Sequence, residues 1–333
     1  MYLSSISLII PVYNGGDSFK QCLTSITQSH HTPDEVIVVA DGDTDGSWQV
    51  AESFGAKVLR FPTPGGPARA RNLGASVAQG DILFFVDADV ELHPNTLSLV
   101  LEAFQQHDDI AALIGSYDDA PGAVNFLSQY KNLFHHYTHQ TSSSNAFTFW
   151  GACGAIRRSI FNEMGGFDER YLKPCVEDIE LGYRLKQAGH SIRLCKNIQV
   201  KHLKEWKPIS LLRAEIFYRA IPWTELILDN PNVAMNLNLS LANRLSVILT
   251  LMLILSIMLG FFLPIIWFSS LIILIALLMI NREIYHFFYI NRGLRFTLQV
   301  IPWHWFYFLY GGMAFAYSSG KYYLAKATSH SEL

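Results

Sequence analysis

Residues 82–89 read ILFFVDAD, and this stretch decides how the N-terminal part of the chain is expected to fold. The run from Ile82 to Val86 has the length and the β-branched and aromatic content of a strand buried on both faces of a parallel sheet. Asp87 and Asp89 follow it at once. Ligands of open parallel sheets bind outside the carboxyl ends of the strands, so the two acids fall where a binding site is expected.

Two further runs of the same kind, 6–10 (ISLII) and 36–39 (VIVV), precede this strand. Helix-like stretches alternate with the three runs, which is typical of βαβ units in a doubly wound, mostly parallel α/β sheet with flanking helices. Asn14 and Asp41 also follow strand ends, so polar groups are expected along one edge of the sheet. The expected helices cover residues 17–29, 46–54, 67–78 and 94–106.

The order is less regular after residue 115. A helix is expected over 122–139, followed by a mobile loop at 140–146 (QTSSSNA). A Gly-Gly turn at 165–166 comes before a helix over 177–187, and SIRLC then forms a further strand.

The C-terminal part differs in composition from the rest. Half of the 333 residues are hydrophobic and 16% are charged, and the charges thin out towards the C-terminus. Residues 245–280 form one apolar stretch, long enough for two transmembrane helices in a hairpin because about 20 residues span a bilayer. The alternative is a buried helical hairpin. A shorter run, 301–317, is rich in Trp and Tyr and either spans the membrane or lies in its interface. Arginines flank both ends of the hairpin, which places both ends in the cytosol: Arg244, Arg282, Arg292 and Arg295.

The segment 207–230 has the pattern of an amphipathic helix. It lies either at the membrane surface, with its lysines and arginines facing anionic headgroups, or in the soluble part as an ordinary packing helix. We therefore divide the chain into a soluble domain at 1–206, an interfacial helical linker at 207–240 and a membrane region at 241–333.

Composition also excludes some classes of function. A net charge of −3 gives no sign of a nucleic-acid partner. The four cysteines include no C-x-x-C pair, which favours a reducing compartment over a disulfide framework or a zinc site. The N-terminus lacks the basic segment of a signal peptide, so we expect the soluble domain to stay in the cytosol.

The D-A-D sequence indicates a metal site. On a strand, Asp87 and Asp89 would point to the same side. Two carboxylates on one side are hard oxygen ligands for Mg²⁺ or Mn²⁺, whose coordination shell substrate phosphates complete. An ion held there stabilises the charge that grows on a departing nucleoside diphosphate. A lone D-x-D pair is a weak signal and is more often a surface turn.

The order of several motifs is more specific than any one of them. P-V-Y-N follows the first strand, and after it come V-V-A-D-G-D-T-D-G-S, G-G-P-A-R-A-R-N-L-G-A, F-F-V-D-A-D, G-G-F-D-E, V-E-D-I-E-L-G-Y-R-L and V-K-H. This ordered set, over roughly residues 5–205, resembles family 2 glycosyltransferases, which have the GT-A fold. The resemblance implies transfer of a sugar from a nucleotide-sugar donor.

The resemblance also implies residues on the donor side. Asp41 matches the carboxylate that accepts a hydrogen bond from the base, although Ala40 stands where the family often has a second acid. We expect a UDP-sugar, with a GDP-sugar as the alternative. An arginine near the start of the 67–78 helix pairs either with phosphate or with a nearby acid. The implied donor residues are Pro11, Val12, Tyr13, Asn14, Asp41, Arg69, Arg71, Asp87 and Ala88.

Asp178 matches the family's general base, which takes the proton of the acceptor hydroxyl as it attacks the anomeric carbon. The alternative is that the acids at this helix start only stabilise its N-terminus. His202 matches a histidine that contacts the metal or the diphosphate in some GT-A enzymes. The expected metal ligands are Asp87, Asp89 and His202. The expected acceptor-side residues, whose aromatic members either stack on a sugar or belong to the core, are Trp150, Gly151, Glu177 and Trp206.

These features predict an inverting, metal-dependent glycosyltransferase with several spans in the inner membrane and a site facing the cytosol. The expected acceptor is a lipid or a lipid-linked glycan of the cell envelope; a polyprenyl phosphate, already an anion, would need Asp178 less. A processive polysaccharide synthase is an alternative, but it would carry more spans and a Q-x-x-R-W motif, which this sequence lacks. A non-catalytic membrane scaffold, the other alternative, would not need the three aspartates intact.

Overall fold

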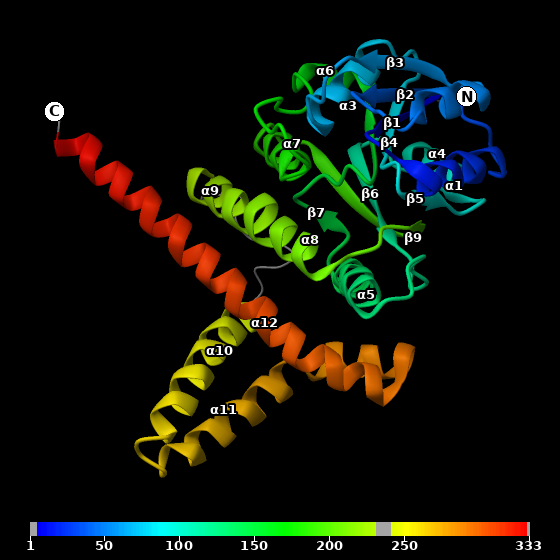
Figure 1. Cartoon of the computed structure of the whole chain (residues 1–333). Helices are drawn as coiled ribbons and strands as arrows, with labels where there is room; N and C mark the ends of the chain where they lie inside the picture. Colours follow the sequence, from blue (N-terminus) through cyan, green and yellow to red (C-terminus); the bar gives the residue numbers. More distant parts are fainter. Residues whose placement is uncertain (1–4, 231–240, 332–333) are drawn as a thin grey trace. The chain divides into compact units, whose positions relative to one another are not determined.

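The computed structural model describes residues 5–230 and 241–331, and the chain divides into two compact units, Met1–Pro208 and Ile209–Leu333 (Figure 1). The part of the expected linker from 231 to 240 lies outside the described residues. Each unit is built from its own elements and is taken separately below.

The N-terminal unit is a sheet with helices packed on it (Figure 1). Its strands are β1 (Ile6–Val12), β2 (Glu35–Asp41), β3 (Lys57–Phe61), β4 (Ile82–Val86), β5 (Val90–Leu92), β6 (Ile110–Tyr117), β7 (Asn145–Ala146), β8 (Cys153–Arg157) and β9 (Ser191–His202). Its helices are α1 (Gly16–Thr27), α2 (Ser47–Ser53), α3 (Pro67–Ser76), α4 (Thr96–Gln106), α5 (Phe126–Thr141), α6 (Arg158–Glu163) and α7 (Glu177–Gln187).

The sheet has the order β3-β2-β1-β4-β8-β6-β9-β5, with β7 beside β9. The first four strands are parallel, and Ile9 lies opposite both Ile37 and Phe85. In the second half only β6 and β9 pair in parallel, whereas β8 is antiparallel to both of its neighbours and β5 and β7 are antiparallel to β9. The expected α/β fold with flanking helices is confirmed, but the sheet is mixed, because the βαβ alternation stops after β4.

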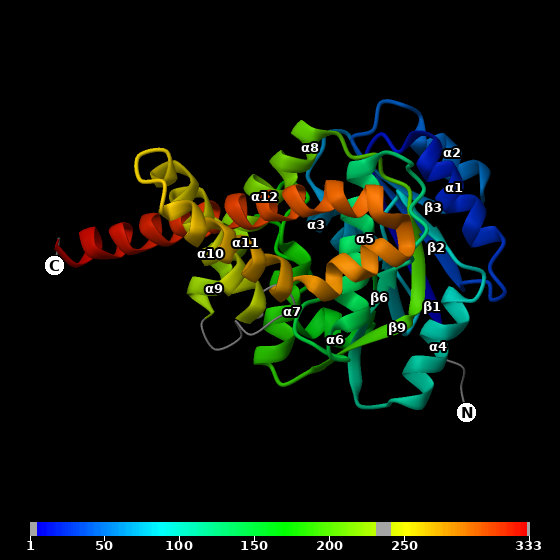
Figure 2. The same ribbon diagram turned by 90° about the horizontal axis from the view of Figure 1, so that it is seen from below.

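Strands β1 and β4 of the parallel half are mostly apolar and buried. Ile9 in β1 and Phe85 in β4 are fully buried, as is every other residue of β4. Burying one such side chain contributes about 1.5–3 kcal/mol, so the strand ends are firmly fixed. Helix α3 packs on β1 and β2, and α1 and α2 lie side by side (Figure 2).

Five strands, β3, β5, β6, β7 and β8, lie outside the expected runs, and β9 is longer than expected. β3 has charged residues at Lys57 and Arg60 and no apolar run, so the sequence did not indicate it. β7 lies inside the tract expected to be a mobile loop, where its backbone pairs with β9. β9 itself continues without a break from the expected SIRLC strand to His202.

The C-terminal unit is helical. Its elements are α8 (Pro208–Arg213), which begins at the boundary, the π-helix η1 (Ala214–Ala220), α9 (Ile221–Asp229), α10 (Leu241–Gly260), α11 (Ile266–Ile280) and α12 (Arg282–Ser331). The expected amphipathic helix is thus three consecutive segments, of which η1 and α9 pack on α12. Helices α10 and α11 pack on each other as the expected hairpin, with hydrogen bonds from Ser270 Oγ to Ser256 Oγ and from Asn281 Nδ2 to Ser246 Oγ, both 2.9 Å long.

One helix in the described part of the chain, α10, is long and apolar enough to cross a membrane. Helices α11 and α12 pass the same criterion only together, as a helix bent by 65° at the break. The aromatic run 301–317 lies within α12, in the part that follows a kink at Gly293, where the backbone is not helical. These helices therefore give one candidate span, or two if the bent pair counts as one span, and the expected multi-pass arrangement is not shown.

Candidate active site

The carboxyl ends of three neighbouring strands form the edge on which the site is built. β2, β1 and β4 are adjacent and parallel. Asp41 is the last residue of β2, Asn14 follows the end of β1, and Asp87 follows the end of β4. The sheet therefore brings these three polar side chains to one edge, where α/β folds bind ligands.

The loop after β1 is bonded to the loop after β2. Pro11 and Val12 are the last residues of β1, and Tyr13 extends beyond them with 57% of its surface exposed. Asn14 has a φ of +50°, a left-handed conformation that asparagine tolerates better than most residues. Its Oδ1 accepts hydrogen bonds from the backbone N–H of Thr44 (2.8 Å) and from the Thr44 hydroxyl (3.3 Å). Asn14 thus shapes the edge by joining two loops.

Asp41 holds the loop in front of α3. Its two carboxylate oxygens accept hydrogen bonds from the backbone N–H groups of Gly65 and Gly66, each 2.8 Å long. A Cβ atom on Gly66 would lie 2.7 Å from the carbonyl oxygen of Leu172, so glycine is required there. Each carboxylate oxygen has a further lone pair, which leaves Asp41 able to accept a hydrogen bond from a base as well.

The two arginines of A-R-A-R-N have different environments. Arg71 is buried, and its guanidinium donates to Glu177 Oε1 (2.8 Å) and to Asp87 Oδ1 (2.7 Å). Burial opposes the charge, but Asp87, Glu177 and Asp178 outweigh it and raise the pKa of Arg71 above its usual value. Arg69 is exposed, with its Cζ 3.9 Å from the ring centroid of Phe61. Arg71 is therefore an internal cross-link between α3, the end of β4 and the start of α7.

Asp178 lies in the first turn of α7, as the sequence predicts. Its Oδ2 accepts a hydrogen bond from the backbone N–H of Gly151 (3.0 Å), and its Oδ1 accepts one from that of Ile179 (2.8 Å). Gly151 approaches the guanidinium too closely for a side chain, since a Cβ there would be 2.8 Å from Arg71 Cζ. Glu177 is buried and accepts a second hydrogen bond from the N–H of Cys175 (2.9 Å), so it faces the interior.

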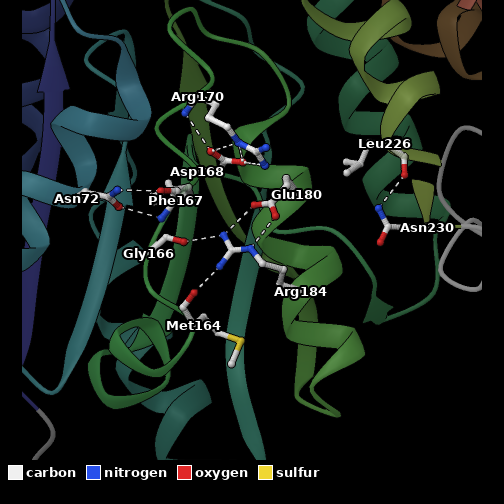
Figure 3. A network of polar contacts seen from close by, with 10 residues as sticks. All are labelled: Asn72, Met164, Gly166, Phe167, Asp168, Arg170, Glu180, Arg184, Leu226 and Asn230. Atoms are coloured by element: carbon white, nitrogen blue, oxygen red, sulfur yellow. Dashed lines mark hydrogen bonds and ion pairs between the residues drawn. The ribbon is translucent and has the colours of Figure 1, made fainter. Parts of the chain in front are cut away.

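Two residues that the sequence did not single out fix the loop that leads to α7 (Figure 3). Asn72 exchanges hydrogen bonds with the backbone N–H and C=O of Phe167, each 2.8 Å long. Arg184 pairs with Glu180 and also donates to the carbonyl oxygens of Met164 and Gly166. In the sequence, only their positions could have indicated these two residues: Asn72 directly follows Arg71, and Arg184 lies one helical turn after Glu180.

The D-A-D sequence is a turn and does not continue the strand. β4 ends at Val86, and a backbone hydrogen bond from the N–H of Val90 to the carbonyl oxygen of Asp87 (3.2 Å) closes the turn. The expectation that both acids point to one side of a strand is therefore wrong. Asp87 contacts Arg71, whereas Asp89 lies beside His202. Ala88, between them, packs against the core.

Asp89 has two basic neighbours at the end of β9. His202 Nε2 and Lys204 Nζ each lie 3.8 Å from Asp89 Oδ2. The Tyr117 ring stacks on His202 with centroids 4.4 Å apart and fixes the plane of the imidazole. Burial lowers the pKa of His202, against the opposing effect of Asp89. The imidazole is thus kept neutral, the form in which it binds metals.

The expected metal set is assembled only in part. Within residues 5–230 and 241–331, no three His, Cys, Asp or Glu side chains form a group that could hold a metal. An oxygen of Asp87 is occupied by Arg71. Asp89 and His202 remain close together, and a carboxylate oxygen with an imidazole nitrogen suits Mn²⁺ in type, with further positions left for donor phosphates.

The two tryptophans assigned to the acceptor side differ. Trp150 is buried, and its ring contacts those of Tyr117, His135 and His139, so it belongs to the core behind His202. Trp206 follows β9 and is half-buried, with Lys204 Nζ 4.6 Å from its ring centroid.

Comparison with known proteins identifies the N-terminal unit. Residues 7–165 match the family described as Glycosyl transferase family 2. The O-antigen chain rhamnosyltransferase WbaN of Salmonella anatum is 25% identical over 67% of this chain and 75% of its own. The N-acetylglucosaminyl-diphospho-decaprenol L-rhamnosyltransferase of Mycobacterium tuberculosis is 24% identical over 60% of this chain and 76% of its own. Residues 7–165 therefore form a family 2 glycosyltransferase domain.

A solved structure agrees with this fold. The mannosyltransferase PcManGT from Pyrobaculum calidifontis, in complex with GDP-Man and Mn²⁺, has a TM-score of 0.52 at 16% identity, covering 95% of this chain and 88% of that one. The N-terminal unit thus has the GT-A fold of these transferases. The chain spans less than half the length of two further bacterial glycosyltransferases that it matches, 42% of one at 32% identity and 32% of the other at 36%.

Proposed function

We propose that this protein transfers a sugar from a nucleotide-sugar donor to a lipid or lipid-linked glycan, with inversion at the anomeric carbon. The observation that carries the proposal is the Arg71 network. It connects Asp87, on the donor side of the sheet edge, to the helix start that bears Asp178. A leaving-group site and a candidate base are thereby fixed relative to each other before any substrate binds.

On the donor side, Asn14 and Asp41 line the expected nucleotide site, with UDP as the expected nucleotide. The complex of PcManGT with GDP-Man and Mn²⁺ supports a nucleotide sugar and a divalent ion, and leaves a GDP-sugar as the alternative. Asp89 and His202 would hold the ion, together with phosphate oxygens of the donor. Such an ion would supply positive charge for the departing diphosphate.

On the acceptor side, the carboxylate of Asp178 takes the proton of the attacking hydroxyl. The new bond forms at the anomeric carbon as the bond to the diphosphate breaks, and the electron pair leaves with the nucleoside diphosphate. The hydrogen bond from the Gly151 N–H to Asp178 Oδ2 orients the carboxylate.

The C-terminal unit supports a lipid-linked acceptor. Helices α10 and α11 and the turn between them expose large apolar side chains, for example Phe262 (81%) in the turn and Phe268 (68%) in α11. Such surfaces mark contact with a membrane or a partner. One relative is named for an acceptor on diphospho-decaprenol, which supports a lipid-linked acceptor here. We place the protein at the inner membrane, with the catalytic unit in the cytosol.

The test is Asp178→Asn in the full chain, after a thermal-shift screen of nucleotide sugars with Mn²⁺ has identified the donor. Sugar transfer should fall by about 10²–10⁴-fold, the usual contribution of a general base, while donor affinity stays within about twofold. Transfer at the wild-type rate would show that Asp178 is not the base or that the acceptor is a phosphate. The matched control is Asp168→Asn, in the loop before α7.

A further inference from the structure

The segment after β9 is firmly attached to the rest of the N-terminal unit. The backbone N–H of Leu203 donates to the carbonyl oxygen of Asp89 (2.8 Å), and that of Trp206 donates to Ser128 Oγ (2.7 Å). Asn125, the cap residue of α5, donates from Nδ2 to the carbonyl oxygen of Trp206 (3.2 Å). Lys204 is one of the two residues between these anchors, so its backbone is held in place beside the D-A-D turn.

Lys204 is a cation with unused hydrogen-bonding capacity. Its Nζ lies 3.8 Å from Asp89 Oδ2, which is an ion pair without a hydrogen bond, and 4.6 Å from the Trp206 ring centroid. Its side chain is 45% exposed. An ammonium group has three donors, and the described contacts leave them available to a ligand.

The charges around it show why a cation is needed. Four carboxylates, those of Asp87, Asp89, Glu177 and Asp178, gather near the end of β4 and the start of α7. Both terminal nitrogens of Arg71 are already bonded to carboxylates. A diphosphate that enters this region meets a negative field, which one divalent ion offsets only in part.

We infer that Lys204 binds the diphosphate of the donor and stays bound to the nucleoside diphosphate as it leaves. This inference rests on the proposed function. As the bond from the anomeric carbon to the phosphate oxygen breaks, the electron pair moves onto that oxygen. The Lys204 ammonium donates a hydrogen bond to the phosphate and keeps its proton. Trp206 positions the lysine stem by stacking beneath the ammonium.

The test measures nucleotide binding rather than turnover. The full chain in detergent is titrated by calorimetry with UDP, GDP and ADP and with UMP, GMP and AMP, once with Mn²⁺ and once with EDTA. Lys204→Met should weaken binding of the preferred diphosphate about tenfold, the loss expected for one charge-assisted hydrogen bond, and binding of its monophosphate less than twofold. Lys204→Arg should restore most of the affinity.

Lys201→Met is the matched control. It removes the same charge three residues earlier, and Lys201 Nζ pairs with Glu91 at 3.6 Å on a side chain that is 32% exposed. Unchanged diphosphate affinity in Lys204→Met, or equal losses in the two variants, would overturn the role of Lys204 alone. If the wild type binds none of the diphosphates in either condition, the proposed function fails as well.

Discussion

Asp87 and Asp89 are separated by one residue, yet they lie in two different environments. Asp87 belongs to an inner cluster with Arg71 and Glu177, in which charged groups are hydrogen-bonded at 2.7 and 2.8 Å. Asp89 belongs to an outer cluster with His202 and Lys204, in which both contacts are 3.8 Å long. The inner acid is committed to the protein, and the outer acid remains available to a ligand. The two acids of one motif therefore serve different purposes.

Energetics separates the two clusters in the same way. Removing one member of a buried ion pair costs about 3–5 kcal/mol, because the remaining charge is stranded in a medium of low dielectric constant. An exposed ion pair contributes about 0–1 kcal/mol. Substitutions in the inner cluster should therefore change the free energy of unfolding, and substitutions in the outer cluster should change ligand affinity.

The largest effect is expected for Arg71→Met. It leaves Glu177 buried without its partner, so the free energy of unfolding should fall by about 3 kcal/mol. For a unit of this size that corresponds to a melting temperature about 10 °C lower, measured by circular dichroism on the full chain.

Arg69→Met, two residues earlier in α3, is the control for this change. Arg69 is exposed and only stacks on Phe61. The melting temperature of the Arg69→Met variant should therefore differ from that of the wild type by about 2 °C or less. Equal shifts in the two variants would remove the distinction between an inner and an outer cluster.

A smaller effect, of opposite kind, is expected for Asp89→Asn. Mn²⁺ affinity, followed by calorimetry in the presence of the preferred nucleoside diphosphate, should fall at least about tenfold because a proposed metal ligand is lost. The free energy of unfolding without metal should stay within about 1 kcal/mol of the wild type. Asp87→Asn should show the reverse, with a loss of about 1.5–3 kcal/mol in stability. Equal changes in Mn²⁺ affinity and in the free energy of unfolding for the two variants would contradict the different roles of Asp87 and Asp89.

The smallest effect is a pH dependence that arises in the outer cluster. Because burial lowers the pKa of His202, the unfolded chain binds a proton below about pH 6.5 that the folded chain still lacks. The free energy of unfolding therefore rises with pH through this window, and the contribution of His202 is complete above it. Between pH 7.5 and 5.5 the wild type should lose about 1 kcal/mol that His202→Gln retains. Melting curves that shift in parallel for both proteins would speak against a buried neutral imidazole.

Much of the N-terminal unit was predictable from local pattern. The apolar runs at β1, β2 and β4 and the 177–187 helix form where their sequences indicate. Two of the failures, β3 and β7, have the same physical cause. β3 gains its place by pairing with β2, and β7 by pairing with β9, so in both cases a long-range partner outweighs a polar local sequence.

The candidate site was predictable in its residue types but not in its pairings. Arg69 and Arg71 look alike in the sequence, and on a helix two residues this far apart face different directions. Which of them is buried depends on Asp87 and Glu177, which are 16 and 106 residues away from Arg71. The same limit applies to Asp89, whose basic neighbours come from the end of β9.

Asp41 has a consequence for attempts to change the nucleotide preference. Its two oxygens already hold Gly65 and Gly66, the backbone that leads into α3. An Asp41→Asn exchange, the obvious way to alter base recognition, replaces one acceptor with a donor that faces a backbone N–H and so releases this loop. A substitution at Asp41 would therefore change the base preference and the order of this loop at the same time. An engineered change of donor is better sought at Tyr13, which is exposed at the same edge and does not hold the Gly65–Gly66 backbone.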